Sequence, residues 1–390
     1  MLIVCTHFGE NTAAYRRLSY FAKYLRSRGL RVSCIGFLGI SSSGIVKPSR
    51  GCYGLPFFIS TRHIWGLILN AIFSLFVIVV ILISRPRMVI LSIPDASLVV
   101  ATYLGCLLIG SKLIIDIRDP QEEIIAHKYK QGLSSLIAKI FRQINYSIYR
   151  RADVVTGVTR TLVTMLANAT SKFIHLVPNG ADLKIFVPIN KGEARETLGL
   201  SQDSFLIAYV GGLVAYEQYD VLPILTAIKR AKESSDINVR LTAAGPISNE
   251  NDRRIIEKFK DVVSYMGVLD TKGVLTLLSA CDVGVIPRVG DPIYDYALPV
   301  KFYEYIAMGL PVIAITNRKS ELAKIVEDNK LGLVCKPGDQ LCLENAIMTL
   351  ATDKSLLGEL KRNVFAFRKN IDRSIGAERL YGLINKLLQT

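Results

Sequence analysis

Short apolar segments alternate with helix-like segments along the 390-residue chain, and this alternation runs through the chain twice. The apolar segments are continuous, which is typical of strands buried on both faces of a parallel sheet. The first series predicts strands over 1–6, 31–37, 88–92, 112–117, 154–158 and 175–178, and the second over 205–210, 238–243, 262–266, 283–287 and 311–315. Repeated strand–helix–strand units form doubly wound sheets, so we expect an α/β protein with two Rossmann-like domains and an interdomain cleft.

The segment 12–28 shows how the helices between these strands are identified. Leu18, Phe21, Ala22 and Leu25 have the i, i+3, i+4, i+7 spacing of one helix face, and Gly29 follows as a helix end. Further helices are predicted over 96–110, 133–151, 159–168, 222–232, 252–259, 272–280, 301–308 and 375–388.

The restart of the pattern after residue 187 sets the expected domain boundaries. We predict an N-terminal domain over 1–187, a C-terminal domain over 188–374, and a C-terminal helix within 375–390 as a candidate to pack back on the N-terminal domain.

The start of the chain and its cysteines favour a cytoplasmic protein. Residues 1–5 are apolar but lack the basic region and small-residue cleavage site of a signal peptide. The seven cysteines are scattered, are odd in number and have no metal-ligand spacing, so we expect reduced structural thiols and no metal site.

The net positive charge is concentrated in the first part of the chain. Residues 1–150 contain 18 Lys and Arg against 6 Asp and Glu, whereas the rest contains 30 against 27. A basic N-terminal region suggests an anionic partner, which is a membrane surface, a nucleic acid or a phosphorylated substrate. Its apolar content favours the membrane, and the patterns of nucleic-acid-binding motifs are absent from the sequence, so we expect no nucleic-acid partner.

The segment 64–84 has no charged residue over 21 positions and is followed by Arg85 and Arg87. It is long enough to span a bilayer, but a single crossing would separate the strand at 88–92 from its partners in the sheet. A helix that lies on the membrane keeps the sheet together and places arginines against anionic lipid. We favour this membrane contact, with a buried core helix and a spanning helix as alternatives.

Five stretches of the second half of the sequence carry a family resemblance. They are 151–155 (RADVV), 177–182 (VPNGAD) followed by Phe186 and Pro188, 208–212 (AYVGG), 280–287 (ACDVGVIP) and 299–312 (PVKFYEYIAMGLPV). In this order and at these spacings, the chain resembles the retaining, nucleotide-sugar-dependent glycosyltransferases of the GT-B fold, family 4 type, also called group 1 glycosyltransferases. The resemblance is strongest from residue 152 to 337.

The last of these stretches has the chemistry of a nucleotide-diphosphate site. Pro299 suits the first turn of a helix, whose N-terminus offers amide groups and a positive dipole end to a diphosphate. Lys301 and Glu304 share a helix face, so Lys301 can neutralise phosphate charge. A carboxylate can accept hydrogen bonds from both ribose hydroxyls, and the resemblance implies that role for Glu304. The alternative is an ordinary Lys–Glu pair on a surface helix.

Other residues of the expected donor site depart from the family pattern. Gly211 and Gly212 end a strand where backbone can approach a ligand, or they form an ordinary turn. Relatives have an Arg and a Lys at the positions of Gly212 and Glu217, and Arg288 is either a substitute cation or a plain surface arginine.

A second departure lies in the loop before the predicted donor helix. The first glutamate of the family's pair falls at Tyr296, and the adjacent Asp295 is our candidate to reach the donor sugar.

The acceptor side is expected on the N-terminal domain. Residues 118–120 (RDP) end a strand and resemble a segment of relatives that act on lipid-linked sugars, and Asp119 is a candidate to orient or deprotonate the acceptor hydroxyl, or else a turn cap. The first strand is followed by a turn that relatives place near the acceptor. Its candidates are His7, Gly9, Glu10 and Asn11.

We therefore expect a glycosyltransferase that moves a sugar with retention from a UDP- or GDP-sugar to a lipid-linked acceptor, in cell-surface glycan or glycoprotein assembly. We expect no cofactor and no required metal ion, and a peripheral location at the cytoplasmic face of a membrane. Two alternatives remain open, which are a nucleotide-sugar 2-epimerase of the same fold and a non-catalytic partner subunit of a transferase.

Overall fold

The computed structural model describes residues 1–7, 13–37, 40–41, 44–45, 52–55, 64–93, 98–213, 218–247 and 249–389. The chain divides into two compact units. The N-terminal unit comprises Met1–Gly180 together with Arg373–Thr390, and the C-terminal unit comprises Ala181–Asp372. The chain therefore returns to the N-terminal unit with its last helix. The boundary between the two units after Gly180 lies seven residues before the boundary expected after residue 187.

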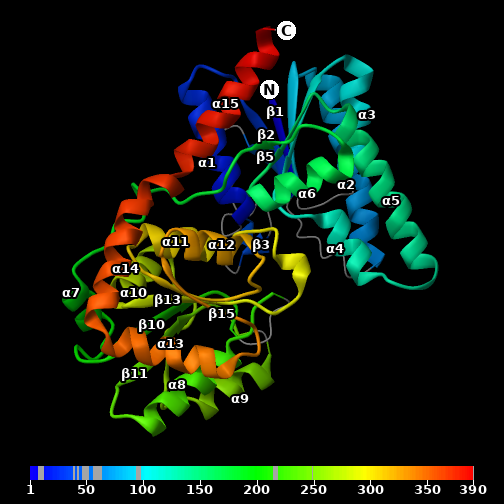
Figure 1. The fold of residues 1–390 in the computed structure, drawn as a ribbon. Coiled ribbons are helices and arrows are strands. Elements are labelled where there is room, and N and C mark those ends of the chain that lie inside the picture. Colours follow the sequence, from blue (N-terminus) through cyan, green and yellow to red (C-terminus); the bar gives the residue numbers. More distant parts are fainter. Residues whose placement is uncertain are drawn as a thin grey trace. The chain divides into compact units, whose positions relative to one another are not determined.

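A parallel sheet forms the centre of the N-terminal unit (Figure 1). Its strand order is β5-β2-β1-β6-β7-β8-β9, so the direction of sheet growth reverses between β1 and β6. The strands are β1 (Leu2–His7), β2 (Ser33–Phe37), β5 (Cys52–Leu55), β6 (Met88–Ile93), β7 (Lys112–Ile117), β8 (Val154–Gly157) and β9 (His175–Leu176), and a separate antiparallel pair is formed by β3 (Ile40–Ser41) and β4 (Gly44–Ile45).

The helices of this unit alternate with its strands. They are α1 (Ala13–Ser27), α2 (Ile64–Ser84), α3 (Leu98–Ile109), α4 (Gln121–Lys128), α5 (Gly132–Arg151), α6 (Arg160–Thr170) and α15 (Arg373–Gln389). Helix α15 packs beside α1, and Leu380 and Ile384 join Leu18 and Phe21 in one core cluster. Gly376 allows this approach, because a Cβ there would lie 2.4 Å from the carbonyl oxygen of Pro178.

Helix α2 has the bounds that the sequence predicts, with one buried and one exposed side. Phe73, Val77 and Ile81 are buried, whereas Leu75 and Ile83 are 64% and 80% exposed. The buried side meets α3, where a Cβ at Gly105 would lie 3.1 Å from Ile81 Cδ1. Among the residues that the structure describes, no helix is both long and apolar enough to cross a membrane.

The C-terminal unit is built on a six-stranded parallel sheet of order β12-β11-β10-β13-β14-β15. Its strands are β10 (Phe205–Val210), β11 (Val239–Ala244), β12 (Val263–Tyr265), β13 (Val283–Pro287), β14 (Val312–Ile315) and β15 (Gly332–Cys335). This is the strand order of a Rossmann fold, and its topological switch point lies between β10 and β13.

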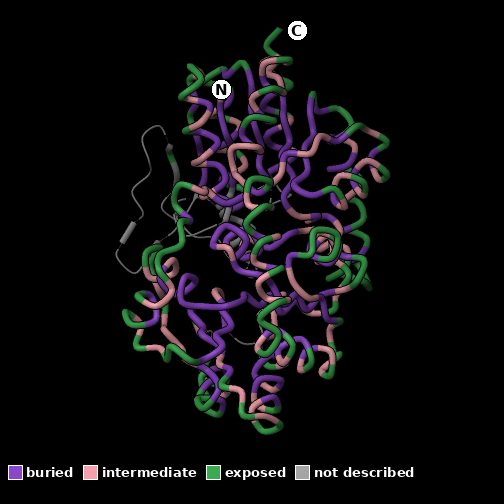
Figure 2. Tube along the Cα trace, turned by 60° about the vertical axis from the view of Figure 1, so that its left-hand side comes forward, coloured by how far each residue is buried: buried purple, intermediate pink, exposed green. Residues whose placement is uncertain are grey.

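Helices cover both faces of this sheet, and the side chains of β10 alternate between them. Ile207 and Tyr209 pack with α8 (Leu222–Ser234), α9 (Glu250–Lys258) and α13 (Gln340–Thr352). Leu206 and Ala208 pack with α10 (Thr271–Ala280), α11 (Val300–Ala307) and α12 (Glu321–Asp328). The remaining elements are α7 (Lys191–Thr197), α14 (Lys354–Phe367) and the short 3-10 helices η1 (Pro292–Tyr294) and η2 (Arg368–Ile371). Figure 2 shows the buried interior of each unit in purple.

In each sheet, an aspartate that directly precedes one strand accepts a hydrogen bond from the start of the neighbouring strand. Asp153 accepts a hydrogen bond from the amide of Leu113 at the start of β7 (2.8 Å), and Asp282 accepts one from the amide of Leu206 at the start of β10 (2.9 Å). Asp282 is also buried against Arg195, at 2.9 Å. The two aspartates of the sequence motifs at 151–155 and 280–287 thus hold neighbouring strands in register.

One expectation about the cysteines is wrong. Cys335 at the end of β15 and Cys342 in α13 form a disulfide across the turn that joins them, with Cα atoms 5.8 Å apart. The sequence gives no sign of this pair, because a separation of seven residues becomes a close approach only when a strand turns directly into a helix. The described cysteines Cys106 and Cys281 are buried free thiols, as expected.

Candidate functional site

The candidate site of the C-terminal unit lies at its topological switch point, where this class of fold binds ligands. The loop that follows β10 is hydrogen-bonded to the residues that follow and end β13. The amide of Asp220 donates to the carbonyl of Pro287 (3.0 Å), and the amide of Val289 donates to the carbonyl of Gln218 (3.1 Å). Helix α11 follows this loop region and carries the predicted pair of Lys301 and Glu304.

Lys301 is a buried cation surrounded by aromatic rings. Its Nζ lies 3.5 Å from the ring centroid of Tyr219 and 4.4 Å from that of Tyr209, which are cation–π distances. Burial lowers the pKa of Lys301 to about 7, the positive charge of Arg288 acts in the same direction, and the negative charge of Glu304 opposes both. A surface Lys–Glu pair is excluded, because Lys301 and Glu304 are only 8% and 7% exposed.

Gly211 lets the backbone pass directly over Lys301. A Cβ at this position would lie 3.1 Å from Lys301 Nζ, and the φ of Gly211 is +149°, which side chains rarely adopt. The end of β11 also approaches Gly211 closely, because a Cβ at Gly245 would lie 1.9 Å from the carbonyl oxygen of Gly211. Gly212 accepts a hydrogen bond from the hydroxyl of Tyr209 through its carbonyl (2.8 Å).

Helix α11 begins at Val300, one residue before the predicted range 301–308. Pro299 occupies the N-cap position instead of the first turn, and it provides no capping side chain. The carbonyl of Pro299 accepts from the amide of Phe302 (3.0 Å). A helix start without a side-chain cap leaves early amide groups for a ligand oxygen to satisfy.

Arg288 is a second buried cation at this place, 5% exposed at the end of β13. Its guanidinium donates to the carbonyl oxygen of Tyr294, and within the described part of the chain its Nε has no hydrogen-bond partner. A plain surface arginine is therefore excluded. Leaving a buried donor unsatisfied is costly, which favours a ligand acceptor beside it.

Asp295 lies at the end of η1 and is fixed by Asn317. The Asn317 side-chain amide donates to both carboxylate oxygens of Asp295, at 3.1 and 3.3 Å. Burial raises the pKa of Asp295, and Asn317 and the positive charge of Arg288 oppose that change. Asp295 is thus part of the Arg288 region, and a role toward the donor sugar stays a prediction.

Three residues of this site escape sequence reasoning. Tyr209 and Tyr219 form the aromatic surroundings of Lys301, and Asn317 holds Asp295. Tyr209 lies within the AYVGG stretch, but the sequence pattern there predicts only a buried strand residue. Tyr219 and Asn317 come from other loops, and only the fold brings them to α11.

The acceptor-side candidates lie on the N-terminal unit. Asp119 follows β7 in the turn to α4, where its carbonyl accepts from the amide of Gln121 (2.9 Å). His7 ends β1, on the same parallel sheet. Gly9, Glu10 and Asn11 lie outside the described residues, as does Glu217 of the donor loop. Within the described ranges, no group of three or more His, Cys, Asp and Glu residues could hold a metal ion.

Comparison with known proteins bears on this site. Residues 204–353 match the family model "Glycosyl transferases group 1", which covers β10 through α13. The probable glycosyltransferase WbjE of Pseudomonas aeruginosa is 24% identical over 333 residues, which are 82% of this chain and 80% of WbjE. The D-inositol 3-phosphate glycosyltransferase of Stackebrandtia nassauensis is 26% identical over 55% of this chain, which spans about half (49%) of that relative.

Solved structures match the whole fold at low identity. Sucrose-phosphate synthase from Thermosynechococcus elongatus has a TM-score of 0.75 at 16% identity, covering 100% of this chain and 98% of the other. WaaG, a glycosyltransferase involved in lipopolysaccharide biosynthesis, has a TM-score of 0.73 at 14% identity, covering 98% and 99%. Anabaena HepE in complex with UDP-glucose has a TM-score of 0.67 at 16% identity, covering 98% and 99%.

The fold and the family match point to the same class of enzyme. The chain has two α/β units with parallel sheets, and solved structures match it over nearly its whole length, which gives the GT-B fold. The family match falls on the unit that holds Lys301 and Glu304. This match favours a transferase over the 2-epimerase that the sequence left open. The chain is a glycosyltransferase with the GT-B fold, and its residues 204–353 are similar to the group 1 glycosyltransferases.

Proposed function

We propose that this glycosyltransferase moves a sugar, with retention of configuration, from a UDP- or GDP-sugar on its C-terminal unit to a lipid-linked acceptor that binds its N-terminal unit. The observation that supports the donor assignment best is Lys301, a buried cation one helical turn from Glu304 at the switch point of the sheet. HepE, which shares the fold, was solved with UDP-glucose.

The donor would bind with its diphosphate at Lys301, Arg288 and the start of α11, and its ribose hydroxyls at the carboxylate of Glu304. When the bond between the sugar and the diphosphate breaks, negative charge grows on the leaving phosphate. Fixed cations and helix amides stabilise that charge more than they stabilise the bound substrate. Because these groups supply the positive charge, we propose no cofactor and no required metal ion, and expect activity to persist in a chelator.

The acceptor hydroxyl must lose its proton as it attacks the sugar carbon. Asp119, at the carboxyl end of β7, is our candidate to orient that hydroxyl and take the proton. Asp295 is the candidate for a contact with the donor sugar, and His7 for the acceptor side.

A membrane location is the third part of the proposal. The exposed side of α2 carries Ile72, Leu75, Val79 and Ile83, which are between 49% and 80% exposed. Arg85 and Arg87 follow this side in the sequence and are exposed. An exposed aliphatic face next to arginines is typical of a helix that lies on an anionic membrane. We therefore propose that the protein works at the cytoplasmic face of a membrane, in the assembly of a cell-surface glycan or glycoprotein.

Incubation of the purified full chain with a panel of UDP- and GDP-sugars and a bacterial lipid extract tests the reaction. We expect one labelled sugar to enter the lipid phase, and the Glu304→Ala variant to lose this transfer. Nucleotide-sugar binding without transfer to any lipid would instead support the non-catalytic partner subunit. Failure to bind any nucleotide would refute the donor site itself.

A further inference from the structure

The exposed apolar surface of the N-terminal unit continues beyond α2 onto α3 and α5. Helix α3 packs between α2 and α5. Leu107 and Leu108 at the end of α3 are 63% and 69% exposed, and Leu133 and Leu136 at the start of α5 are 73% and 55% exposed. Large aliphatic side chains are thus exposed on three helices that pack in succession, and exposed apolar surface of this kind marks membrane or protein contacts.

Most of the charge around this surface is positive. Residues 124–152 contain six Lys and Arg residues and no Asp or Glu, and α2 and α3 contain no charged residue. Arg142 is paired with Glu123 (3.1 Å), whereas Lys139 and Arg151 are exposed beside the apolar residues. Aliphatic surface flanked by cations is complementary to an anionic lipid, which presents acyl chains beneath a layer of phosphates.

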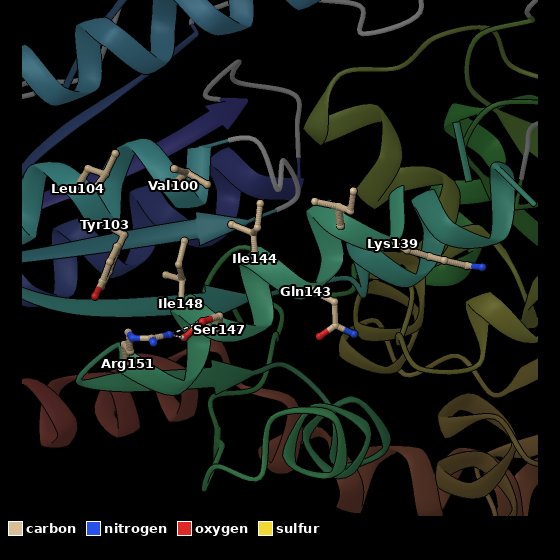
Figure 3. Close-up of a pocket in the computed structure, with 10 residues that line it drawn as sticks. Val100, Tyr103, Leu104, Lys139, Gln143, Ile144, Ser147, Ile148 and Arg151 are labelled. Carbon is tan, nitrogen blue, oxygen red and sulfur yellow. Dashed lines mark hydrogen bonds between the residues drawn. The ribbon is translucent and has the colours of Figure 1, made fainter. Parts of the chain in front are cut away.

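A groove of about 650 Å³ lies between α3 and α5 within this surface. Its volume falls within the range of roughly 300–1,000 Å³ typical of small-molecule sites. Figure 3 shows Val100 and Leu104 of α3 facing the groove together with Ile144 and Ile148 of α5. Both helices therefore contribute aliphatic side chains to the walls, and the polar Gln143 lines the groove between Lys139 and Ser147.

Polar groups also lie at the two ends of the groove. Tyr103, Ser147 and Arg151 lie at one end and Lys139 lies toward the other (Figure 3). Twelve residues separate Lys139 from Arg151, which is roughly 18 Å along a helix. The guanidinium of Arg151 is held at its end by the carbonyl oxygen (3.0 Å) and the hydroxyl of Ser147.

We propose that the groove between α3 and α5 binds one anionic phospholipid of the membrane on which the protein lies. An acyl chain lies along Leu104, Ile144 and Ile148, and the phosphate accepts hydrogen bonds from Arg151 and the hydroxyl of Tyr103. This proposal rests on the proposed membrane location of the protein. It adds a specific lipid to what is otherwise a general surface attraction.

Titration of the full chain with dioctanoyl phosphatidylglycerol, kept below its micelle concentration, tests the site by calorimetry. We expect saturable binding of one lipid per chain, and binding at least tenfold weaker for dioctanoyl phosphatidylcholine, whose net charge is zero. The variant Ile144→Trp fills the groove and should weaken binding at least tenfold. Arg151→Gln should weaken it by a similar factor, because the phosphate loses its cation.

Matched control variants lie on the C-terminal unit. Leu341 of α13 is 67% exposed, and Leu341→Trp should leave lipid affinity unchanged. Arg253 of α9 is exposed, and Arg253→Gln should also leave it unchanged. Absence of saturable binding, or equal affinity of Ile144→Trp and the unmodified chain, would overturn the proposal.

Two further readouts separate this site from its rivals. If the chain is a dimer by light scattering and Leu108→Glu converts it to a monomer, the surface belongs to a second copy and the lipid proposal is refuted. Nucleotide-sugar affinity is measured on the same samples. A chain that binds UDP-glucose but no lipid contradicts only the lipid site, and one that binds lipid but no nucleotide contradicts only the donor site.

Discussion

Lys301 carries its charge in a place where few protein groups can solvate it. Its ammonium group lies against two tyrosine rings, and its nearest hydrogen-bonding contact among the described residues is the hydroxyl of Tyr209 at 3.5 Å. Arg288 adds a second buried cation nearby, and Glu304 is the acidic group that raises the pKa of Lys301. Such an arrangement is costly unless an anionic ligand completes it.

This environment predicts a pH dependence of donor affinity. The pKa of free Lys301 is lowered to about 7, and a bound diphosphate raises it. The affinity for UDP-glucose should therefore be highest below pH 7 and fall by up to about tenfold per pH unit as pH rises above 7 toward the pKa of the complex. Calorimetry at pH 8 in two buffers of different ionisation enthalpy should show proton uptake on binding. The Lys301→Met variant should bind weakly with no proton uptake, and uptake by neither protein would contradict the assignment.

The unliganded protein should show the same linkage in its stability. The pKa of Lys301 is about 7 in the fold against 10.5 for an ordinary lysine, so the unfolded chain binds more protons between these values. The free-energy cost of burying the charged Lys301 on folding is fully present below pH 7 and disappears as pH rises toward 10.5. Lys301→Met should thus raise the melting temperature at pH 6, and raise it less at pH 9. An equal change at both pH values would show that folding does not lower the pKa of Lys301.

Glu304 can be tested through donor affinity alone. Hydrogen bonds to a charged group contribute about 1.5–3 kcal/mol, so Glu304→Ala should weaken UDP-glucose binding by roughly 10- to 100-fold. The measurement belongs at pH 6, because loss of Glu304 lowers the pKa of Lys301 further. Glu327→Ala, on the exposed side of α12, serves as the control, and full affinity in Glu304→Ala would refute the ribose contact.

At the level of elements, sequence periodicity predicts most of the fold. The strands at 112–117, 205–210 and 283–287 and the helix at 64–84 have the predicted bounds, because long apolar runs end at charged, Gly or Pro residues. Helices α4, α7, α12, α13 and α14 and strand β15 were not predicted. Their patterns are short or depend on caps such as Asn190 of α7 and Ser320 of α12, whose side chains accept amide hydrogen bonds.

The donor site divides in the same way between predictable and unpredictable parts. Gly211, Arg288, Lys301 and Glu304 stand next to strand ends or on one helix, so local spacing identifies them. Tyr219 and Asn317 become part of the site only through tertiary packing of separate loops. The disulfide of Cys335 and Cys342 was missed for a related reason, since it depends on the geometry of one turn.

The buried aspartate at the start of β13 gives a prediction about stability. Asp282 accepts hydrogen bonds from Arg195 and from the amide of Leu206, and it is 5% exposed. Asp282→Ala leaves the buried Arg195 without its carboxylate and should destabilise the C-terminal unit by about 3–5 kcal/mol. Thermal unfolding followed by circular dichroism measures this loss. The control Glu327→Ala removes an exposed ion pair with Arg318 and should cost less than about 1 kcal/mol, and a similar loss in both variants would contradict the role of Asp282.

At the level of the whole molecule, the sequence distributes charge and apolar surface unequally. The net positive charge is concentrated in 1–150, where acidic residues are few, and the exposed side of α2 lies in the same region. The full chain should therefore float with vesicles that contain phosphatidylglycerol and stay unbound with pure phosphatidylcholine. High salt should weaken this binding, because it screens charge at the surface. Ile83→Glu should reduce binding strongly and Leu341→Glu should not, and equal flotation of both variants would count against the membrane surface.

The central claim is that Lys301 and Glu304 hold the donor of a sugar transfer. The most direct test is a crystal structure of the full chain with a UDP- or GDP-sugar. We predict diphosphate oxygens within hydrogen-bond distance of Lys301 Nζ and the first amides of α11, and ribose hydroxyls on the Glu304 carboxylate. A nucleotide bound elsewhere in the chain, with Lys301 still enclosed only by Tyr209 and Tyr219, would contradict it.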